Sequence, residues 1–493
     1  MNVVFRFLRP ALSLVASGVL LMTSCKKAED VTPVAPATLT KAATGPVTDT
    51  EVDSWILGNM KFWYYWNDKI PAKPDTTLAP DQFFKSILNT FNATTNPTGD
   101  RFSWINKSAD DLKAGLSGEE TTTGMEFKLF LREANSTDII AKVLYVQRNS
   151  PAEKAGVKRG DIISSVNGTK LTTTNYSDVI FGEGTTKTYG FATIDNNKIV
   201  DSNVTKSITA VVYQADPVYL DSVYTIKGKK IGYLVYNQFV PGPNNTKTAA
   251  YDQQLRSVFG KFKGQGISEL VLDLRYNPGG YVSSSTVLGS LIGKGINSSK
   301  LFYRKEYNAT LTPEYQAYDK KNGTDSFNGF FADEANNIGG NLQRVYVLTT
   351  GGSASASELV INGLRPFMEV ITIGTTTYGK NVGSITIDDK TKRIKWGMQP
   401  IVSKTFNALN QSDYSTGFVP KVEVKEFTNV AWKPLGDISD ALLNEAIFQI
   451  TGGRTARVAS RTGVETRSVD SSIERKAGGS NMFFTDKLPT LNQ

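Results

Sequence analysis

The stretch GGSASASE, residues 351–358, places three serines at alternate positions behind a pair of glycines. A serine hydroxyl can attack a carbonyl carbon only when a nearby base accepts its proton. The chain of 493 residues contains no histidine, which excludes a Ser-His-Asp triad and every histidine-ligated metal site. A hydrolytic site in this chain must therefore take its base from lysine, aspartate, glutamate or tyrosine.

Ser355 is the best-placed of the three serines. The apolar strand RVYVLTT (344–350) precedes it and the helical stretch ASELVINGL (356–364) follows it, so Ser355 falls in a turn at a helix N-terminus. The N–H of Ala356 then has no partner within the helix, and the glycine-rich turn NPGG offers a second amide at Gly280. Two such amides aimed at one point form an oxyanion hole. Ser353 and Ser357 are expected to hold the turn, because alternate positions point to different sides.

Lys380, in the loop TTYGK, lies 25 residues beyond Ser355 and is the candidate base. A free lysine has a pKa near 10.4 and is protonated at neutral pH, so it cannot accept the serine proton. Burial and neighbouring dipoles would have to lower this pKa by about 3 units. We therefore expect the Lys380 side chain to be buried.

The stretch SPAEKAGVKRGDIISSVNG (150–168) resembles the middle of a PDZ domain. The resemblance implies a carboxylate-binding loop at Thr122, Thr123, Gly124 and Met125, and a strand with Phe127 and Leu129 beside the peptide groove, with TNYSDVIF (174–181) as the groove helix. Physically, such a groove adds an extended peptide to an open sheet edge. A PDZ-like fold that packs only against its own chain is the alternative.

The motifs LDLRYNPGG, GGSASASE and TTYGK occur in the order found in the carboxyl-terminal processing, or tail-specific, serine peptidases, which this chain resembles over roughly residues 115–450. The resemblance implies Ser355 as nucleophile, Lys380 as general base, and Gly280 and Ala356 as the oxyanion amides. It further implies a crotonase-like (ClpP-like) α/β core acting on protein substrates near their C-termini. Many members carry glutamine four residues after the lysine, whereas this chain has Ser384 there.

Two other functions compete with peptidase activity. A lipid-anchored PDZ scaffold that binds C-terminal tails without cleaving them is favoured by Ser384, but the intact Ser355–Lys380 pair argues against it. GTTTYGKN (374–381) matches the phosphate-binding pattern G-x-x-x-x-G-K-[ST] except at Asn381, where a magnesium-binding hydroxyl is missing. The next stretch, VGSITIDD, is predicted to form a strand and not a helix, so no nucleotide, metal or other cofactor is expected.

These features predict a multidomain α/β protein. The predicted organisation, taken along the chain, is a lipoprotein signal peptide (1–25), a flexible linker (26–48), a small N-terminal helical domain (49–112), a PDZ domain (113–215), the catalytic domain (216–450) and a flexible C-terminal tail (451–493). Asp53 and Ser54 are candidate caps for the first helix, and the aromatic run WILGNMKFWYYW is expected to form the core of the small domain. Segment 296–343 resembles an insertion that either covers the site or decorates the surface.

Location is predicted from the N-terminus. Arg6 and Arg9 precede the apolar run ALSLVASGVLLM, which is too short to span a bilayer and is typical of a signal peptide. LMTSC resembles a bacterial lipobox, which implies lipidation of Cys25, the only cysteine in the chain. We expect a lipid-anchored protein of the bacterial cell envelope, at the outer membrane on its periplasmic face or at the cell surface. The net charge of +8 is spread along the chain without a basic stripe, so nucleic-acid binding is not expected.

Overall fold

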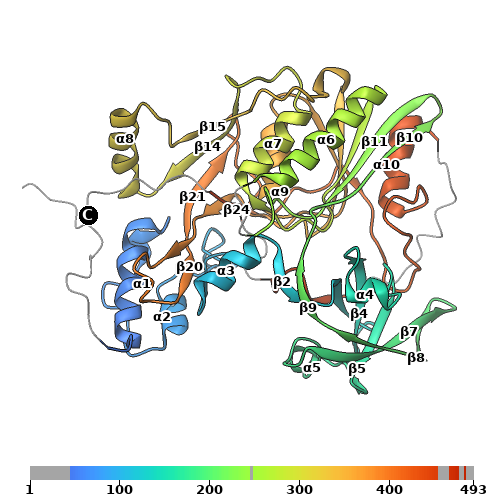
Figure 1. Ribbon diagram of the computed structural model, residues 1–493, viewed down its shortest axis with the longest axis horizontal. Helices are drawn as coiled ribbons and strands as arrows, with labels where there is room; N and C mark the ends of the chain where they lie inside the picture. Colours follow the sequence, from blue (N-terminus) through green and yellow to red (C-terminus); the bar gives the residue numbers. More distant parts are fainter. Residues whose placement is uncertain (1–44, 245–247, 454–465, 477–481, 485–493) are drawn as a thin grey trace, which may run out of the picture.

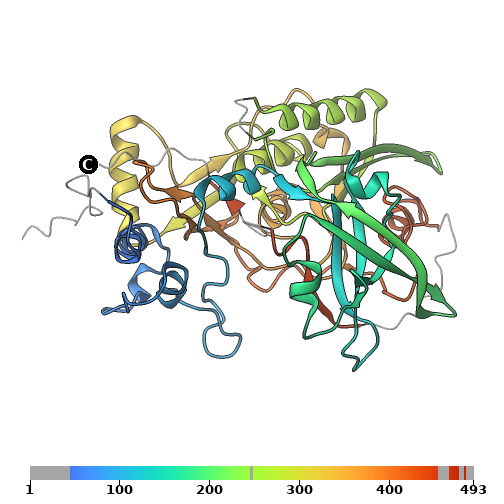
Figure 2. The same cartoon turned by 60° about the horizontal axis from the view of Figure 1, so that its bottom comes forward.

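A computed structural model describes residues 45–244, 248–453, 466–476 and 482–484 (Figures 1 and 2). The predicted signal peptide with Cys25, and nearly all of the predicted linker, lie outside the described residues. Among the helices in the described ranges, none combines the length and the apolar character needed to cross a membrane.

The predicted catalytic domain is built on a six-stranded sheet of order β10-β11-β12-β16-β17-β22. Strands β11 to β22 run parallel, and β10 is an antiparallel edge strand. Leu272 and Val347 point to the face covered by α6, α7 and α9, whereas Val271 and Leu348 point to the face covered by α10 (Figure 1). The apolar strand predicted at RVYVLTT (344–350) is confirmed as β16. The elements are β10 (Val218–Ile226), β11 (Lys229–Tyr236), α6 (Ala250–Gln265), β12 (Glu269–Asp273), α7 (Val282–Ile292), β16 (Arg344–Thr349), α9 (Ala356–Leu364), β17 (Glu369–Gly374), β22 (Val422–Glu423) and α10 (Ala441–Thr451).

A second sheet of the same domain has the order β13-β24-β18-β21-β14-β15 and contains the two strands of the predicted insertion, β14 and β15. Segment 296–343 supplies β14, α8, β15 and η2, and β14 pairs with β21, so the segment is built into this sheet. Asn308 Nδ2 donates to the carbonyls of Phe62 and Tyr64, at 3.0 and 2.8 Å, and thereby ties the segment to the N-terminal domain. The elements are β13 (Gly280–Tyr281), β14 (Leu301–Tyr307), α8 (Leu311–Asn322), β15 (Asn328–Phe330), η2 (Gly339–Asn341), β18 (Val382–Ser384), β21 (Ile401–Phe406) and β24 (Met482–Phe483).

The PDZ domain lies below the catalytic domain in Figure 1. Its sheet has the order β23-β3-β4-β5-β7-β8, and the ribbon β2–β9 joins it to the catalytic domain. Asn167 (φ 50°) and Gly168 (φ 77°) form the predicted tight turn, since both residues adopt the left-handed conformation that such a hairpin requires. The elements are β2 (Glu119–Thr122), β3 (Met125–Leu131), β4 (Ile139–Val146), α4 (Pro151–Lys154), β5 (Ile162–Val166), β6 (Thr169–Lys170), α5 (Tyr176–Ile180), β7 (Thr186–Asp195), β8 (Lys198–Thr209), β9 (Val211–Gln214) and β23 (Ser468–Ser471).

The N-terminal domain differs from prediction in two respects. The cap of α1 is Thr48, which forms a capping box with Glu51, so Asp53 and Ser54 lie inside the helix and the predicted caps are wrong. The aromatic run is buried as expected, but in one hydrophobic cluster with the catalytic domain, because a small helical unit has too little surface to bury alone. The elements are α1 (Asp49–Trp63), η1 (Asn67–Lys69), α2 (Pro80–Ser86), β1 (Trp104–Asn106), α3 (Ala109–Leu116) and the core strands β19 (Ile387–Asp388) and β20 (Gly397–Gln399), which form a small sheet with β1.

The C-terminal region also differs from prediction. Residues 468–471 form strand β23 on the PDZ sheet, and residues 482–483 form strand β24 in the second catalytic sheet. The prediction of a flexible tail is therefore wrong for these described parts. The sequence lacks apolar periodicity there because each piece is a single strand added to a sheet built by other segments.

Candidate active site

Ser355 stands at the junction of β16 and α9, as the sequence predicts. Its backbone has φ 62° and ψ −110°, a conformation that non-glycine residues rarely adopt and that marks a strained turn. The side chain is fully buried, and its Oγ has no hydrogen-bond partner among the described residues. Ser355 is the N-cap of α9 and its backbone N–H donates to Glu358 Oε2, so the turn is held in place while the hydroxyl remains available for chemistry.

The neighbouring serines hold the turn. Ser353 Oγ donates to the carbonyl of Leu274 at 2.7 Å, and Ser357 Oγ donates to the carbonyl of Asn277 at 2.9 Å. Ala354 N donates to the same Asn277 carbonyl at 3.1 Å. The serine turn is thus fastened to the LDLRYNPGG turn at three points, and the structural role predicted for Ser353 and Ser357 is confirmed.

Lys380 follows β17 and is fully buried. Burial lowers the pKa of Lys380 from 10.5 to about 7; Asp100 and Glu358 oppose this shift, and Arg101 adds to it. The Nζ atom lies 4.8 Å from the centre of the Phe102 ring, so its apolar surroundings include the N-terminal domain. A lysine with this pKa is substantially neutral at physiological pH and can accept a proton.

Glu358 links the two loops and was not singled out from the sequence. Its carboxylate is fully buried, and the same oxygen, Oε2, accepts the backbone N–H of Ser355 at 2.9 Å and that of Lys380 at 2.8 Å. The other oxygen accepts Thr377 Oγ1 at 2.5 Å and Gly379 N at 2.7 Å. Burial raises the pKa of Glu358, although these four donors favour its charged form. One acidic side chain therefore fixes the spacing of the two loops.

The N-terminal domain completes the surroundings of Lys380. Arg101 Nη2 donates to the carbonyls of Tyr378, Gly379 and Ser415, at 3.2, 2.9 and 3.0 Å. Its guanidinium lies 4.8 Å from the centre of the Phe102 ring. In the sequence, the motif DRFSW can be recognised only as part of the small domain. Its contact with the lysine loop could not be predicted, because the two are separated by more than 270 positions.

The candidate oxyanion amides are those of Ala356 and Gly280. Ala356 is the first residue of α9, so its N–H has no acceptor within the helix. Gly280 has φ 135°, which favours glycine, and a side chain there would meet the carbonyl oxygen of Phe239 at 2.1 Å. Ser384, the residue in place of the family glutamine, is buried in β18 and donates from Oγ to the carbonyl of Met482 at 3.2 Å.

The predicted peptide-binding residues lie at the β3 edge of the PDZ domain. Thr123 O accepts Ala152 N at 2.9 Å and Gly124 O accepts Gln147 N at 2.7 Å, bonds that shape the loop itself. Met125 begins β3 and is buried in the domain core. Phe127 N donates to Ser472 Oγ at 2.9 Å, so of these positions Phe127 carries a contact with the chain's own C-terminal region.

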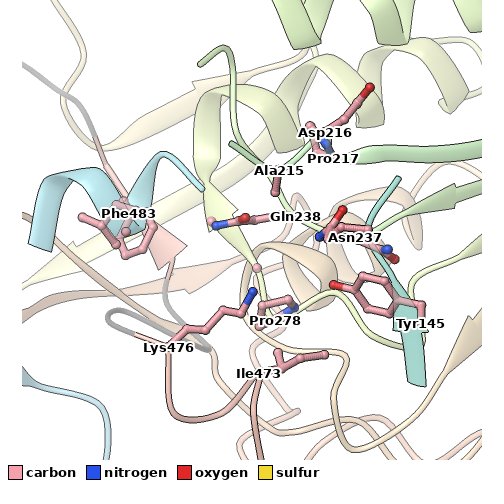
Figure 3. A pocket seen from close by; sticks show the side chains of 15 residues that line it. Tyr145, Ala215, Asp216, Pro217, Asn237, Gln238, Pro278, Ile473, Lys476 and Phe483 are labelled. Atoms are coloured by element: carbon pink, nitrogen blue, oxygen red, sulfur yellow. The ribbon is translucent and has the colours of Figure 1, made fainter. Parts of the chain in front are cut away.

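A pocket lies between the PDZ domain and the NPGG turn (Figure 3). Tyr145 and Gln147 line it from the PDZ domain, Pro278 and Gly280 from the catalytic domain, and Lys476 from the C-terminal region. In Figure 3 the Lys476 side chain extends toward Pro278, while Phe483 stands on the far side of Gln238. The pocket therefore opens directly onto the glycine turn that carries one candidate oxyanion amide.

Comparison with known proteins agrees with this arrangement. The model described as "Peptidase family S41" matches residues 230–411, the model described as "Peptidase S41 N-terminal domain" matches residues 51–104, and a PDZ domain model matches residues 142–183. The first match includes the loops that carry Ser355 and Lys380, the second lies in the N-terminal domain that contacts Lys380, and the third lies in the PDZ domain. The chain matches peptidase family S41 in both its catalytic and its N-terminal domain. The predicted fold class, an α/β peptidase core with a PDZ domain and a small N-terminal domain, is confirmed.

Two relatives and one solved structure show how similar the chain is to known proteins. This chain is 24% identical over 278 residues to the "Probable CtpA-like serine protease" of Staphylococcus aureus strain COL, and 26% identical over 274 residues to the protein of that name from Staphylococcus epidermidis. The matches cover 56% and 55% of this chain but only 47% of each relative. A crystal structure assigned to the S41 proteases, from Bacteroides fragilis, is 27% identical with a TM-score of 0.65, and the match covers 84% of this chain and 99% of that one.

Proposed function

We propose that this protein is a serine endopeptidase that uses a Ser355–Lys380 dyad. The observation that carries the proposal is the buried, unbonded Ser355 hydroxyl in a strained turn, held beside a lysine loop by the Glu358 carboxylate. The lowered pKa of Lys380, about 7, supports its role as the base.

In the proposed reaction Ser355 Oγ bonds to the carbonyl carbon of a peptide while its proton passes to Lys380 Nζ. The amides of Ala356 and Gly280 receive the negative charge on the carbonyl oxygen, each worth roughly 3–4 kcal/mol. Lys380 then gives its proton to the leaving amine as the C–N bond breaks, and water hydrolyses the acyl-enzyme with Lys380 again as base. Glu358 positions both loops without touching substrate.

We further propose that the PDZ domain binds protein substrates near their C-termini and that Cys25 anchors the protein by lipid to the bacterial cell envelope, at the outer membrane or the cell surface. The strand edge of β3 supports the first part, since an extended peptide adds to such an edge. The lipobox-like LMTSC sequence supports the second. Radiolabelled fatty acid incorporated by the full-length chain but not by Cys25→Ala tests the anchor.

The deciding test is digestion of an unfolded protein with an apolar C-terminus by the full chain, by Ser355→Ala and by Lys380→Ala. Cleavage by the first chain alone supports the dyad, provided that both variants keep the wild-type circular dichroism spectrum. Full activity in Lys380→Ala contradicts the mechanism. If no chain cleaves but all bind the tail, the protein is a PDZ scaffold, which the replacement of glutamine by Ser384 favours.

A further inference from the structure

The chain's own C-terminal segment, here defined as residues 466–476 and 482–484, lies in both sites proposed to bind peptide. Its first part runs antiparallel to β3, with Ser468 opposite Phe130 and Ser471 opposite Lys128. Leu131 N donates to the carbonyl of Arg467 at 3.0 Å, and Ser472 N donates to the carbonyl of Phe127 at 3.0 Å. The segment thus takes the backbone bonds that an added peptide strand would make.

Side chains of this first part also contact the groove helix α5. Val469 packs against the PDZ core. The Arg475 guanidinium lies 4.1 Å from the centre of the Phe181 ring and donates to Ser177 Oγ at 3.3 Å. Strand pairing on one side and helix contacts on the other place the segment in the groove between β3 and α5.

A charge cluster around the buried Glu126 carboxylate fixes the end of this part. Lys476 Nζ pairs with Glu120 at 2.6 Å and with Glu126, whose side chain is only 2% exposed. Burial alone would lower the pKa of Lys476, but the two carboxylates outweigh it and hold that pKa well above its ordinary value. Ser472 Oγ donates to the other oxygen of Glu126 at 2.7 Å. A buried carboxylate left without its lysine is costly, so this contact is a strong restraint.

The second part of the segment is a strand of the sheet beside the candidate catalytic loops. Strand β24 lies between β13 and β18, with Met482 opposite Gly280 and Phe483 opposite Ser384. Phe484 N donates to the carbonyl of Ser384 at 3.1 Å, and the Met482 carbonyl accepts Ser384 Oγ at 3.2 Å. β24 therefore runs between the strand of the candidate oxyanion amide and the strand that follows the candidate base. In this arrangement the side chains of Ser355, Lys380 and Ser384 are fully buried.

We propose that the C-terminal segment is an intramolecular ligand of the PDZ groove and of the catalytic cleft, and that an extended polypeptide substrate binds by displacing it. This inference rests on the proposed function, because that function identifies the two occupied places as peptide-binding sites. Two strand-addition sites, far apart in sequence, are filled by one stretch of chain through backbone bonds that any extended peptide can make. The resting protein is then self-occupied, and substrates compete with a tethered strand.

The test measures binding of a fluorescein-labelled peptide of residues 466–476 (TRSVDSSIERK) to the full chain carrying Ser355→Ala, so that cleavage plays no part. The double variant Arg475→Ala/Lys476→Ala weakens the tethered strand, and we expect it to bind the peptide at least tenfold more tightly. Glu474→Ala is the matched control, because its ion pair with Lys128 is long, at 3.8 Å, and partly exposed. Equal affinity of all three chains overturns the proposal.

A second measurement needs no variant in the segment. The Ser355→Ala chain is isotope-labelled, so that its residues 466–476 differ in mass from the added peptide of the same sequence. Its hydrogen exchange is then followed with and without an excess of unlabelled peptide. Displacement predicts that the chain's residues 466–476 lose protection at saturating peptide. Unchanged protection in that region overturns the proposal even if the double variant fails to fold.

Cleavage assays keep the two proposals apart. With Ser355 restored, the double variant is expected to cleave an unfolded protein with a KM at least several-fold lower than that of the wild type. If no chain cleaves anything but peptide affinity still rises in the double variant, the peptidase proposal fails and the intramolecular ligand stands. If cleavage occurs but peptide affinity is unaltered, the peptidase proposal stands and the intramolecular-ligand proposal fails.

Discussion

Lys380→Met is expected to make the protein more stable at neutral pH while abolishing cleavage. Burial lowers the pKa of Lys380 from 10.5 to about 7, whereas the unfolded chain restores the ordinary value. Between these values the unfolded state binds one proton more than the folded state, so the free energy of unfolding rises with pH across this window. Below about pH 7 both states are protonated and the penalty is constant.

The size of the effect is set by the pKa shift. One pKa unit corresponds to about 1.4 kcal/mol, so a pKa lowered from 10.5 to about 7 means that keeping Lys380 buried costs the folded state roughly 4–5 kcal/mol at pH 7. Methionine has a similar length and no charge, and it removes this penalty at a site lined by the Phe102 ring. The gain in unfolding free energy should be largest at or below pH 7 and should disappear as the pH approaches 10.5.

The assay is thermal unfolding of the wild type, Lys380→Met and the control Lys85→Met at a series of pH values from 6 to 10.5. The Lys85 side chain is 71% exposed, so its replacement should leave the pH dependence unaltered. A variant that is less stable than the wild type at pH 7, or a difference that does not depend on pH, would refute the reasoning. Either result would mean that Lys380 keeps its charge in the folded protein.

Three further predictions concern the same loops. kcat/KM should rise with pH through about 7, because only neutral Lys380 accepts the proton; a flat profile between pH 5 and 9 contradicts this. Arg101→Gln should move that rise to higher pH and Asp100→Asn to lower pH, since Arg101 lowers the pKa of Lys380 and Asp100 raises it; identical profiles would show that neither charge reaches the base. Glu358→Gln should lower kcat at least about 100-fold, because an amide has one acceptor oxygen, and its NH2 group must face either the N–H groups of Ser355 and Lys380 or the donors on Thr377 and Gly379; a change confined to KM would argue against positioning.

The chemistry-bearing residues were predictable because they lie in short stretches with strong local signals. Glycine pairs, an apolar strand before each loop and a helix after Ser355 are enough to place that serine at a helix N-terminus. The absence of histidine in the sequence directs attention to Lys380, and the need for a neutral amine predicts its burial. The PDZ turn at Asn167 and Gly168 is equally local, since only a few residue types adopt positive φ readily.

The sequence alone determined which residue types are available for catalysis, the order of the domains and the buried strands that carry the loops. Tertiary structure decided what joins those loops: the Glu358 carboxylate shared by Ser355 and Lys380, the approach of Arg101 across the domain boundary, and the two strands of the C-terminal segment. Each of these depends on backbone amides and carbonyls, which every residue carries. No residue pattern identifies such a bond in advance, because the acceptor becomes specific only when the fold brings it into place.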